Sequence, residues 1–131
     1  MTIRDYRAED FPALCEIDRR CFPPGIAYSP EDIAAALSEP GVVAIVGEEG
    51  SSLLGFLLAA DAHIITIDVL AAHRRSGLGT MLLEEAHRRL AASGARRVRL
   101  EVSVENAAAI AFYTKHGYRE KIGRASCRER V

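Results

Sequence analysis

The chain has 131 residues, of which 49% are hydrophobic and 27% are charged, and its formal net charge is −1. This composition is typical of one soluble globular domain and excludes disordered, collagen-like and coiled-coil proteins. The longest apolar run, residues 53–60, is too short to cross a bilayer, and the N-terminus shows no secretory signal pattern. We therefore expect a cytoplasmic protein with no membrane partner.

The N-terminal half predicts one strand, two helices and a hairpin. An extended segment at residues 2–6 precedes an apolar-periodic helix at residues 9–21. Two prolines and a glycine make residues 22–28 a loop. A second helix follows over residues 29–38, because Ser29 suits an N-cap and Pro30 the first helical position. The β-rich residues 42–48 and 53–60 then form an antiparallel hairpin.

The C-terminal half predicts a strand–helix–strand crossover. Residues 63–70 form a mostly apolar strand, residues 77–93 the longest helix, residues 97–102 a strand and residues 107–116 a last helix. This order predicts an α/β (α+β) fold with a mixed, mostly antiparallel sheet. In that sheet the strands on either side of the longest helix are parallel.

The two halves of the chain carry opposite charge. Residues 1–65 contain 4 Lys+Arg and 11 Asp+Glu, giving −7, whereas residues 66–131 contain 13 and 7, giving +6. The asymmetry is either a chance distribution over solvated faces or a sign of an anionic ligand against the second half. With 4 Tyr, 4 Phe and no Trp, we expect no nucleic-acid partner. The three cysteines and four histidines show no metal-ligand spacing, so no metal is expected.

Residues 68–80 are the most informative segment, because they run from a buried strand through a basic turn into a helix. The first amides of a helix have no internal acceptor, and Gly77 and Gly79 leave room for the close approach of a phosphate. Arg74 and Arg75 add positive charge. An ordinary helix start with two exposed arginines is the alternative interpretation.

Residues 74–79, Arg-Arg-Ser-Gly-Leu-Gly, match the Q/R-x-x-G-x-G/A acetyl-CoA signature of the GNAT N-acetyltransferase superfamily. Residues 100–118 resemble the L-E-V-x-x-x-N-x-x-A-I-x-x-Y-x-x-x-G-F/Y block of ribosomal-protein-alanine N-acetyltransferase-like members. The resemblance covers residues 3–118. It implies a GNAT-like fold with helices on both faces of the sheet and an acetyl-CoA-dependent N-acetyltransferase domain over residues 1–118.

The resemblance also implies where acetyl-CoA, the cosubstrate, would bind. Its pyrophosphate would lie on the turn formed by Arg74, Arg75, Ser76, Gly77, Leu78, Gly79 and Thr80. Val69 would bind the pantetheine arm through its main chain, where the strand splays from its parallel neighbour. Asn106 would contact the same arm near the sulfur, and its alternative role is an N-cap of the following helix.

Two residues match the family's catalytic groups. Glu101 matches the proposed general base and Tyr113 the general acid for the departing thiolate. A solvated strand residue is the alternative for Glu101, and a core position is the alternative for Tyr113. Asp68 and Glu105 are reserve candidates for the base. No chemistry is assigned to the histidines, which are His63, His73, His87 and His116.

The expected acceptor is a primary amine, with a protein or peptide N-terminal α-amino group as the class favoured by the resemblance. Such a group is about a tenth neutral at pH 7, so a modest base suffices. Phe22, Ile26 and Tyr28 in the proline-rich loop would receive the peptide end, or else fix the loop to the core. We expect a monomer or a homodimer.

Family members continue past residue 118 with two more strands. The tail, residues 119–131, is polar and shows no strand alternation. We therefore expect the last hairpin to be missing and the tail to be disordered or foreign, from a truncated reading frame or an assembly-derived extension. An acetyl-CoA-binding module without turnover is the alternative function, because a wall of the acceptor site would then be absent.

Overall fold

A computed structural model describes the backbone of residues 1–121 and 124–130, and its seven strands form one sheet in the order β1-β2-β3-β4-β5-β7-β6. The strands are β1 (Thr2–Asp5), β2 (Val43–Glu49), β3 (Ser52–Ala60), β4 (His63–Val69), β5 (Val98–Glu101), β6 (Arg119–Lys121) and β7 (Arg124–Arg130). The helices are α1 (Phe11–Cys21), α2 (Pro30–Leu37), α3 (Leu78–Ala92) and α4 (Ala107–Lys115), with 3-10 turns η1 (Ala8–Asp10) and η2 (Ala71–His73).

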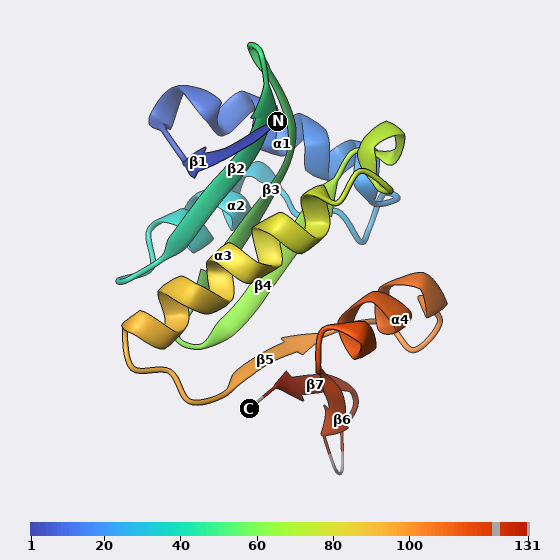
Figure 1. Cartoon of the computed structure of the whole chain (residues 1–131). Helices are drawn as coiled ribbons and strands as arrows, with labels where there is room; N and C mark the ends of the chain where they lie inside the picture. The colour runs from blue at the N-terminus through green and yellow to red at the C-terminus, as the bar shows by residue number, and fades with distance from the viewer. Residues whose placement is uncertain (122–123, 131) are drawn as a thin grey trace.

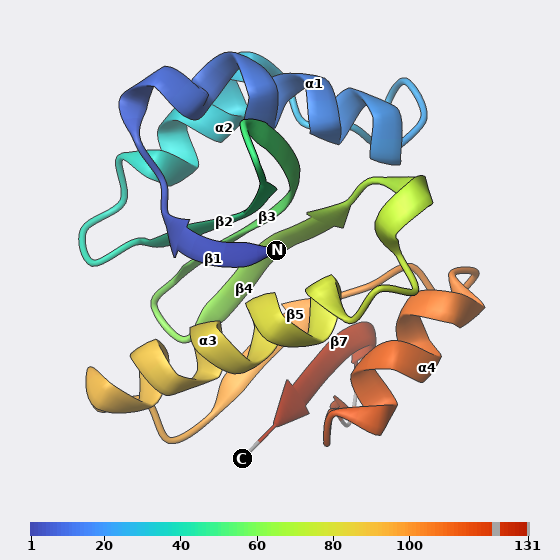
Figure 2. The ribbon, with the colours of Figure 1, turned by 45° about the horizontal axis from the view of Figure 1, so that its top comes forward.

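The predicted fold class is confirmed. Strands β1 to β4 are consecutive antiparallel neighbours, and β4 pairs with β5 in parallel. Helices α1 and α2 cover one face of the sheet, and α3 and α4 lie on the other (Figures 1 and 2). The predicted cap is also present, since the Ser29 hydroxyl accepts a hydrogen bond from the amide of Asp32 at 3.1 Å. No helix in the described part of the chain has the length and apolar character needed to span a membrane.

Each face of the sheet has its own hydrophobic cluster. The apolar side of α3 recurs every three or four residues, which directs one stripe of the helix toward the sheet. Its buried side chains are Leu78, Leu82, Leu83, Ala86 and Leu90. On the opposite face, α1 and α2 bury Leu14, Ile17 and Ile33 against Val46, Phe56 and Leu58.

Two paired glycines make a recess in the sheet that receives the first residue of α3. Gly47 of β2 lies opposite Gly55 of β3, and Leu78 is fully buried above them. A Cβ atom at Gly47 would overlap the Leu78 Cδ1 atom, and a Cβ atom at Gly55 would lie 2.5 Å from the Asp68 carbonyl oxygen. We call this pair the glycine recess. It lets the N-terminus of α3 sit close to the end of β4.

The prediction that the last hairpin is missing and that the tail is disordered is wrong. Strand β7 pairs antiparallel with β5 from Val98↔Arg130 to Glu101↔Cys127, and β6 pairs with β7. The ladder uses main-chain groups that any non-proline residue supplies, so a polar sequence does not prevent it. Residues 122, 123 and 131 of the tail lie outside the described residues. The foreign origin of the tail stays a prediction.

The glycine recess yields a test by double substitution. Leu78→Ala removes a fully buried side chain, so we expect the free energy of unfolding to fall by about 2–5 kcal/mol. Gly47→Ala forces a methyl group against Leu78 and should cost about 1–3 kcal/mol. In the double variant the new methyl group fills vacated space, so the combined loss should be smaller than the sum by about 1 kcal/mol or more. Urea unfolding measures all four proteins.

Gly55→Ala is the matched control for this cycle. Its Cβ would meet the main chain of Asp68, which Leu78→Ala does not remove. The Cβ atom would also lie 3.3 Å from Leu78 Cδ2, which is a much looser contact than the one with Asp68. Most of the loss in the Gly55→Ala background should therefore persist when Leu78 is truncated. Additive losses for Gly47 and Leu78 would contradict the packing described here.

Candidate active site

The candidate site begins where β4 and β5 separate. Within the described residues their parallel register is limited to His63↔Arg99, at the start of both strands. The Arg99 amide donates a hydrogen bond to the Ala62 carbonyl at 3.0 Å, and the strands then diverge toward α4 (Figure 1). Beyond this pair, the C-terminal part of β4 has no parallel partner among the described residues, as the resemblance implied. We call the separation of the two strands the gap.

The turn before α3 presents unpaired amides at the mouth of this gap. Gly77 has φ +87°, a left-handed conformation that favours glycine, and a Cβ atom there would meet open space. No described residue accepts a hydrogen bond from the amides of Gly77, Leu78, Gly79 or Thr80, whereas the Met81 amide donates to the Gly77 carbonyl at 3.0 Å. These amides and the positive end of the α3 dipole form an anion-binding arrangement.

The two arginines of the turn lie in different settings. The Arg74 Nε atom donates to the Val69 carbonyl oxygen at 3.0 Å, so this side chain folds back over the end of β4. Arg75 is exposed. Neither has a salt bridge to a carboxylate in the described part of the chain, whereas Arg88 and Arg89 of α3 both pair with Glu85. The turn therefore carries positive charge that is available to an anion.

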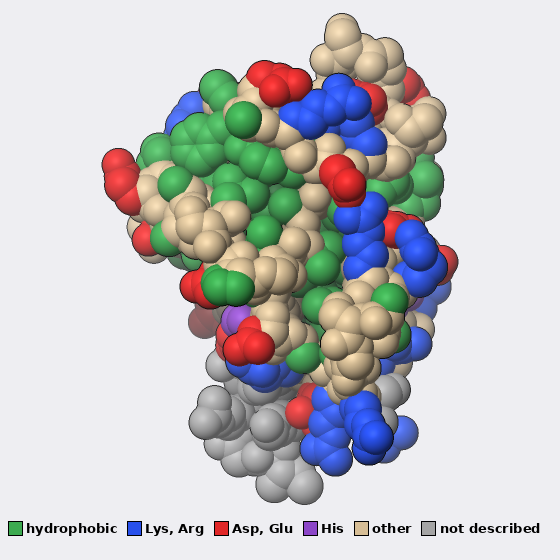
Figure 3. All heavy atoms as spheres, turned by 90° about the vertical axis from the view of Figure 1, so that its left-hand side faces the viewer, with side chains coloured by type: hydrophobic (Ala, Val, Ile, Leu, Met, Phe, Trp, Pro, Cys, Tyr) green, Lys and Arg blue, Asp and Glu red, His purple; other side chains and the backbone are tan. Residues whose placement is uncertain are grey.

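Figure 3 shows how charge is arranged on one face of the molecule. Most Lys and Arg side chains on this face lie in its right-hand half, and hydrophobic side chains gather in its upper left. The view faces the left-hand side of Figure 1, so its right-hand half corresponds to the front of that figure, where α3 runs. On this face, the basic side chains thus lie mainly on the α3 side of the sheet.

Helix α4 brings Asn106 and Tyr113 to the other side of the gap. The Asn106 Oδ1 atom accepts from the Ala109 amide at 3.1 Å, so its role as an N-cap is confirmed and its contact with pantetheine stays a prediction. Tyr113 is 8% exposed and packs edge-on against Phe112 and Tyr118. Burial raises the pKa of Tyr113 above its ordinary value, as does the charge of Asp68 to a lesser extent. Its hydroxyl therefore holds its proton at physiological pH.

Glu101, the predicted base, has a partner that the sequence did not indicate. Its Oε1 atom lies 2.7 Å from the His63 Nε2 atom, and both side chains are partly open to solvent. His63 begins β4 and Glu101 ends β5, so the contact spans the two strands where the gap starts. The prediction that His63 has no chemistry did not anticipate this contact, because it depends on strand register.

The loop between α1 and α2 lies over β4. The Tyr28 hydroxyl donates to the Ile65 carbonyl oxygen at 3.3 Å, and the Tyr28 amide donates to Asp18 Oδ2 at 2.6 Å. Ile26 is 66% exposed and Phe22 is half-buried. Burial raises the pKa of Tyr28, with further increases from the nearby carboxyls, among them Asp18, Asp68 and Glu101. The loop and the Glu101 end of β5 are therefore close together.

The reserve candidates for the base do not fit that role equally. Asp68 is 1% exposed, and burial together with a hydrogen bond to Asp18 raises its pKa to about 9. A carboxyl that keeps its proton at pH 7 cannot accept another from an amine. Glu105 is exposed in the turn before α4. That Glu101 is the base stays a prediction.

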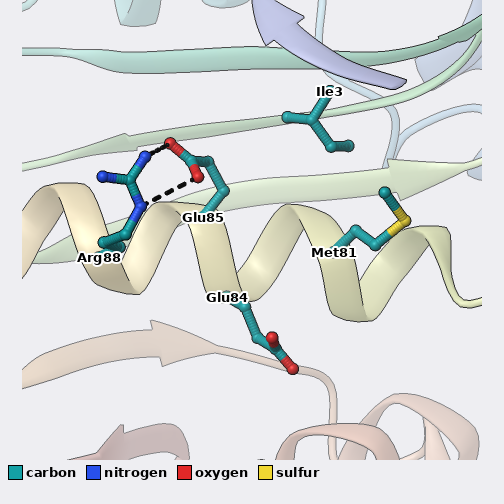
Figure 4. Close-up of a pocket in the computed structure, with 5 residues that line it drawn as sticks. All are labelled: Ile3, Met81, Glu84, Glu85 and Arg88. Atoms are coloured by element: carbon teal, nitrogen blue, oxygen red, sulfur yellow. Dashed lines mark hydrogen bonds and ion pairs between the residues drawn. The ribbon is translucent and has the colours of Figure 1, made fainter. Parts of the chain in front are cut away.

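A shallow hollow elsewhere does not compete with this site. It lies between β1 and α3 and is lined by Ile3, Met81, Glu84, Glu85 and Arg88 (Figure 4). Glu85 is already paired with Arg88 and Arg89, so its charge is not free for a ligand. No group of three or more His, Cys, Asp or Glu among the described residues is placed to hold a metal ion.

The model of the Acetyltransferase (GNAT) family matches residues 11–118. The chain belongs to the GNAT acetyltransferase family. An N-alpha-acetyltransferase of Saccharolobus solfataricus is 27% identical over 136 aligned residues, covering 91% of this chain and 80% of that protein. The resemblance inferred from residues 74–79 and 100–118 is thus confirmed.

Solved structures show the same GNAT architecture. The ribosomal-protein-S18-alanine N-acetyltransferase from Escherichia coli has a TM-score of 0.81 and 25% identity, covering 98% of this chain and 90% of that one. The PaiA N-acetyltransferase from Thermoplasma acidophilum, solved in complex with coenzyme A, has a TM-score of 0.85 and 19% identity, covering 98% and 97%. Both likenesses extend over β6 and β7, because each covers nearly all of this chain.

Proposed function

We propose that this GNAT protein transfers the acetyl group of acetyl-CoA to a primary amine, with the N-terminal α-amino group of a peptide or protein as the acceptor class. The observation that carries the proposal is the set of unpaired amides from Gly77 to Thr80 at the mouth of the β4–β5 gap, with Glu101 and Tyr113 on elements that border that gap. N-alpha-acetyltransferases among the relatives support the acceptor class.

The turn and the end of β4 would hold acetyl-CoA. Its pyrophosphate would accept hydrogen bonds from the free amides of the turn, with charge from Arg75. The residues present fit such a group, because Gly77 puts no side chain in front of these amides. Val69 and Asn106, on either side of the gap, would contact the pantetheine arm. Acetyl-CoA supplies an activated thioester.

Glu101 would accept a proton and Tyr113 would donate one during the transfer. The neutral amine attacks the acetyl carbonyl carbon, a C–N bond forms and the C–S bond breaks. Glu101 takes the proton lost by the amine, directly or through water, and His63 at 2.7 Å orients the carboxylate. Tyr113 gives its proton to the departing thiolate. Because its pKa is raised, the hydroxyl is protonated at physiological pH, so the proton is present when the thiolate leaves.

The carboxyls near the α1–α2 loop suit a cationic acceptor. Glu101 and Asp18 both raise the pKa of Tyr28, and Glu101 is the one of the two that is open to solvent. An incoming ammonium group therefore meets the negative charge of Glu101 before it is deprotonated. Phe22, Ile26 and Tyr28 would contact the first side chains of a peptide. The alternative of a binding module without turnover depended on a missing hairpin, and β6 and β7 are present.

A side chain at Gly77 should block coenzyme binding. Asn tolerates a positive φ, so Gly77→Asn should keep the turn while placing its amide before the free N–H groups. Loss of charge-assisted hydrogen bonds of about 1.5–3 kcal/mol should raise the coenzyme A dissociation constant about 10- to 100-fold. Isothermal titration calorimetry measures the constant.

Gly94→Asn is the matched control for that experiment. Gly94 follows the other end of α3 with φ +98° and also faces open space. It should lose similar stability and keep the affinity for coenzyme A. Equal affinity in a folded Gly77→Asn protein would mean that the phosphates bind elsewhere.

Removal of the Tyr113 hydroxyl should affect the chemical step. We expect Tyr113→Phe to lower kcat about 10²- to 10⁴-fold, because general-acid catalysis contributes that much, with no change in coenzyme A affinity. Release of coenzyme A over a panel of peptides and amines measures turnover. Tyr118→Phe is the control, since the Tyr118 hydroxyl contacts His87 Nε2 at 2.6 Å. Equal turnover in Tyr113→Phe and the parent would assign Tyr113 to the core alone.

Replacement of Glu101 should give a defect that depends on pH. Glu101→Gln cannot take the amine proton, so kcat/KM should fall about 10²-fold or more near pH 7. Above pH 8 an α-amino group is mostly neutral in solution, so we expect the ratio of parent to variant to shrink as the pH rises. A ratio that stays constant from pH 6 to pH 9 would show that Glu101 is not the base.

A further inference from the structure

Two aspartates lie buried between α1 and β4. Asp18 is 0% exposed and Asp68 is 1% exposed. They belong to elements that face each other across the cluster containing Leu14, Ile17 and Phe56. A buried carboxylate is unfavourable unless donors surround it, so two in contact require a specific arrangement of protons.

Each carboxyl has one satisfied and one unsatisfied oxygen. Asp18 Oδ2 accepts from the Tyr28 amide at 2.6 Å, and Asp68 Oδ1 accepts from the Thr66 hydroxyl at 2.5 Å. Asp18 Oδ1 and Asp68 Oδ2 are buried and have no donor among the described residues. A hydrogen bond between the two side chains would use these two oxygens, and Asp18 raises the pKa of Asp68 in the way such a bond would. One proton carried by Asp68 and donated to Asp18 accounts for both remaining oxygens.

The groups around the two aspartates leave the proton in place at neutral pH. Burial and Asp18 raise the pKa of Asp68 to about 9, while Thr66 and Arg74 act in the opposite direction. The other titratable groups that interact with the aspartates are Cys15 and Cys21 of α1, Tyr28 in the loop and Tyr113 on α4, and burial raises the pKa of all four. None of these four carries charge at pH 7.

We propose that Asp18 and Asp68, here called the acid pair, share one proton and thereby position the α1–α2 loop at the acceptor side of the active site. Asp18 acts as a positioning residue through the Tyr28 amide, and Asp68 keeps Asp18 in place by donating to it. The inference rests on the proposed function insofar as that loop receives the acceptor.

The contacts of Tyr28 explain how the pair acts on the loop. Its amide is held by α1 through Asp18 Oδ2, and its hydroxyl is held by β4 through the Ile65 carbonyl. Loss of the shared proton would leave two adjacent negative charges away from water. Separation of α1 from β4 relieves that repulsion. It also moves Tyr28, because the Tyr28 amide is hydrogen-bonded to Asp18 of α1.

Asp68→Asn tests the shared proton through stability. The folded protein holds a proton on Asp68 between its ordinary pKa of 3.8 and about 9, whereas the unfolded chain does not. Stability is therefore lost as the pH rises through that window, with up to about a tenfold increase in the unfolding constant per pH unit. Asn donates to Asp18 at every pH, so we expect this slope to disappear. An equal slope in both proteins overturns the proposal.

Hydrogen exchange of the Tyr28 amide tests the positioning role without any substrate. We expect the protection factor of this amide in the parent to fall about tenfold or more between pH 8 and pH 10, and to stay constant in Asp68→Asn. Asp68→Ala removes the donor to Asp18 and should lose protection already at pH 7. If Asp68→Ala does not fold, Asp68→Asn alone decides. A protection factor that does not respond to pH in the parent overturns the proposal.

The acceptor KM separates positioning from general destabilisation. Across pH 8 to 10 the ratio of acceptor KM in the parent to that in Asp68→Asn should rise about tenfold, while the ratio for acetyl-CoA stays constant. Asp32 is an exposed aspartate that also raises the pKa of Tyr28. The acceptor KM of Asp32→Asn should therefore depend on pH as that of the parent does. Equal pH dependence of both KM ratios overturns the positioning role. If no amine is acetylated, the proposed function fails, and exchange of the Tyr28 amide still decides the acid pair.

Discussion

The contact of Leu78 with the glycine recess determines where α3 begins and therefore where its free amides lie. Gly47 and Gly55 remove two side chains from the face of the sheet, and Leu78 occupies the space they leave. With alanine at both positions, the helix would have to start farther from β4. The turn that precedes α3 would then no longer lie next to Val69, where β4 ends. The packing of Leu78 against the two glycines thus determines where the free amides of the turn lie.

Strand β4 connects the two sides of the candidate site. Its alternation places Thr66 and Asp68 toward α1 and Ile67 and Val69 toward α3. Its first residue, His63, reaches Glu101 on β5. A strand that pairs with one neighbour along its length and with the other only at its start can offer main-chain groups to a ligand while its side chains act on the opposite face.

Local patterns in the sequence predicted the local structure well, because caps, glycine terminators and apolar periodicity act over a few residues. The strand and helix bounds differ from the prediction by about two residues or fewer. The contacts His63–Glu101 and Asp18–Asp68 join residues separated by 38 and 50 positions. They depend on strand register and on the docking of α1, which no local pattern encodes. The glycine recess is of the same kind, and a polar tail concealed the strands that complete the sheet.

The divergence of β4 and β5 divides the sheet into two parts with different connections. Strands β1 to β4 form one continuous ladder, and β5, β7 and β6 form another, joined to it through a single register pair within the described residues. Helix α3 packs on both, since its cluster includes Ile45 and Leu57 as well as Leu100 and Tyr118. Although α3 packs on both ladders, only one described register pair joins them, so we expect the second ladder to open at a lower free energy than the first. A ligand bound in the gap would touch both units and make their unfolding a single event, so binding and cooperativity of folding are coupled in this architecture.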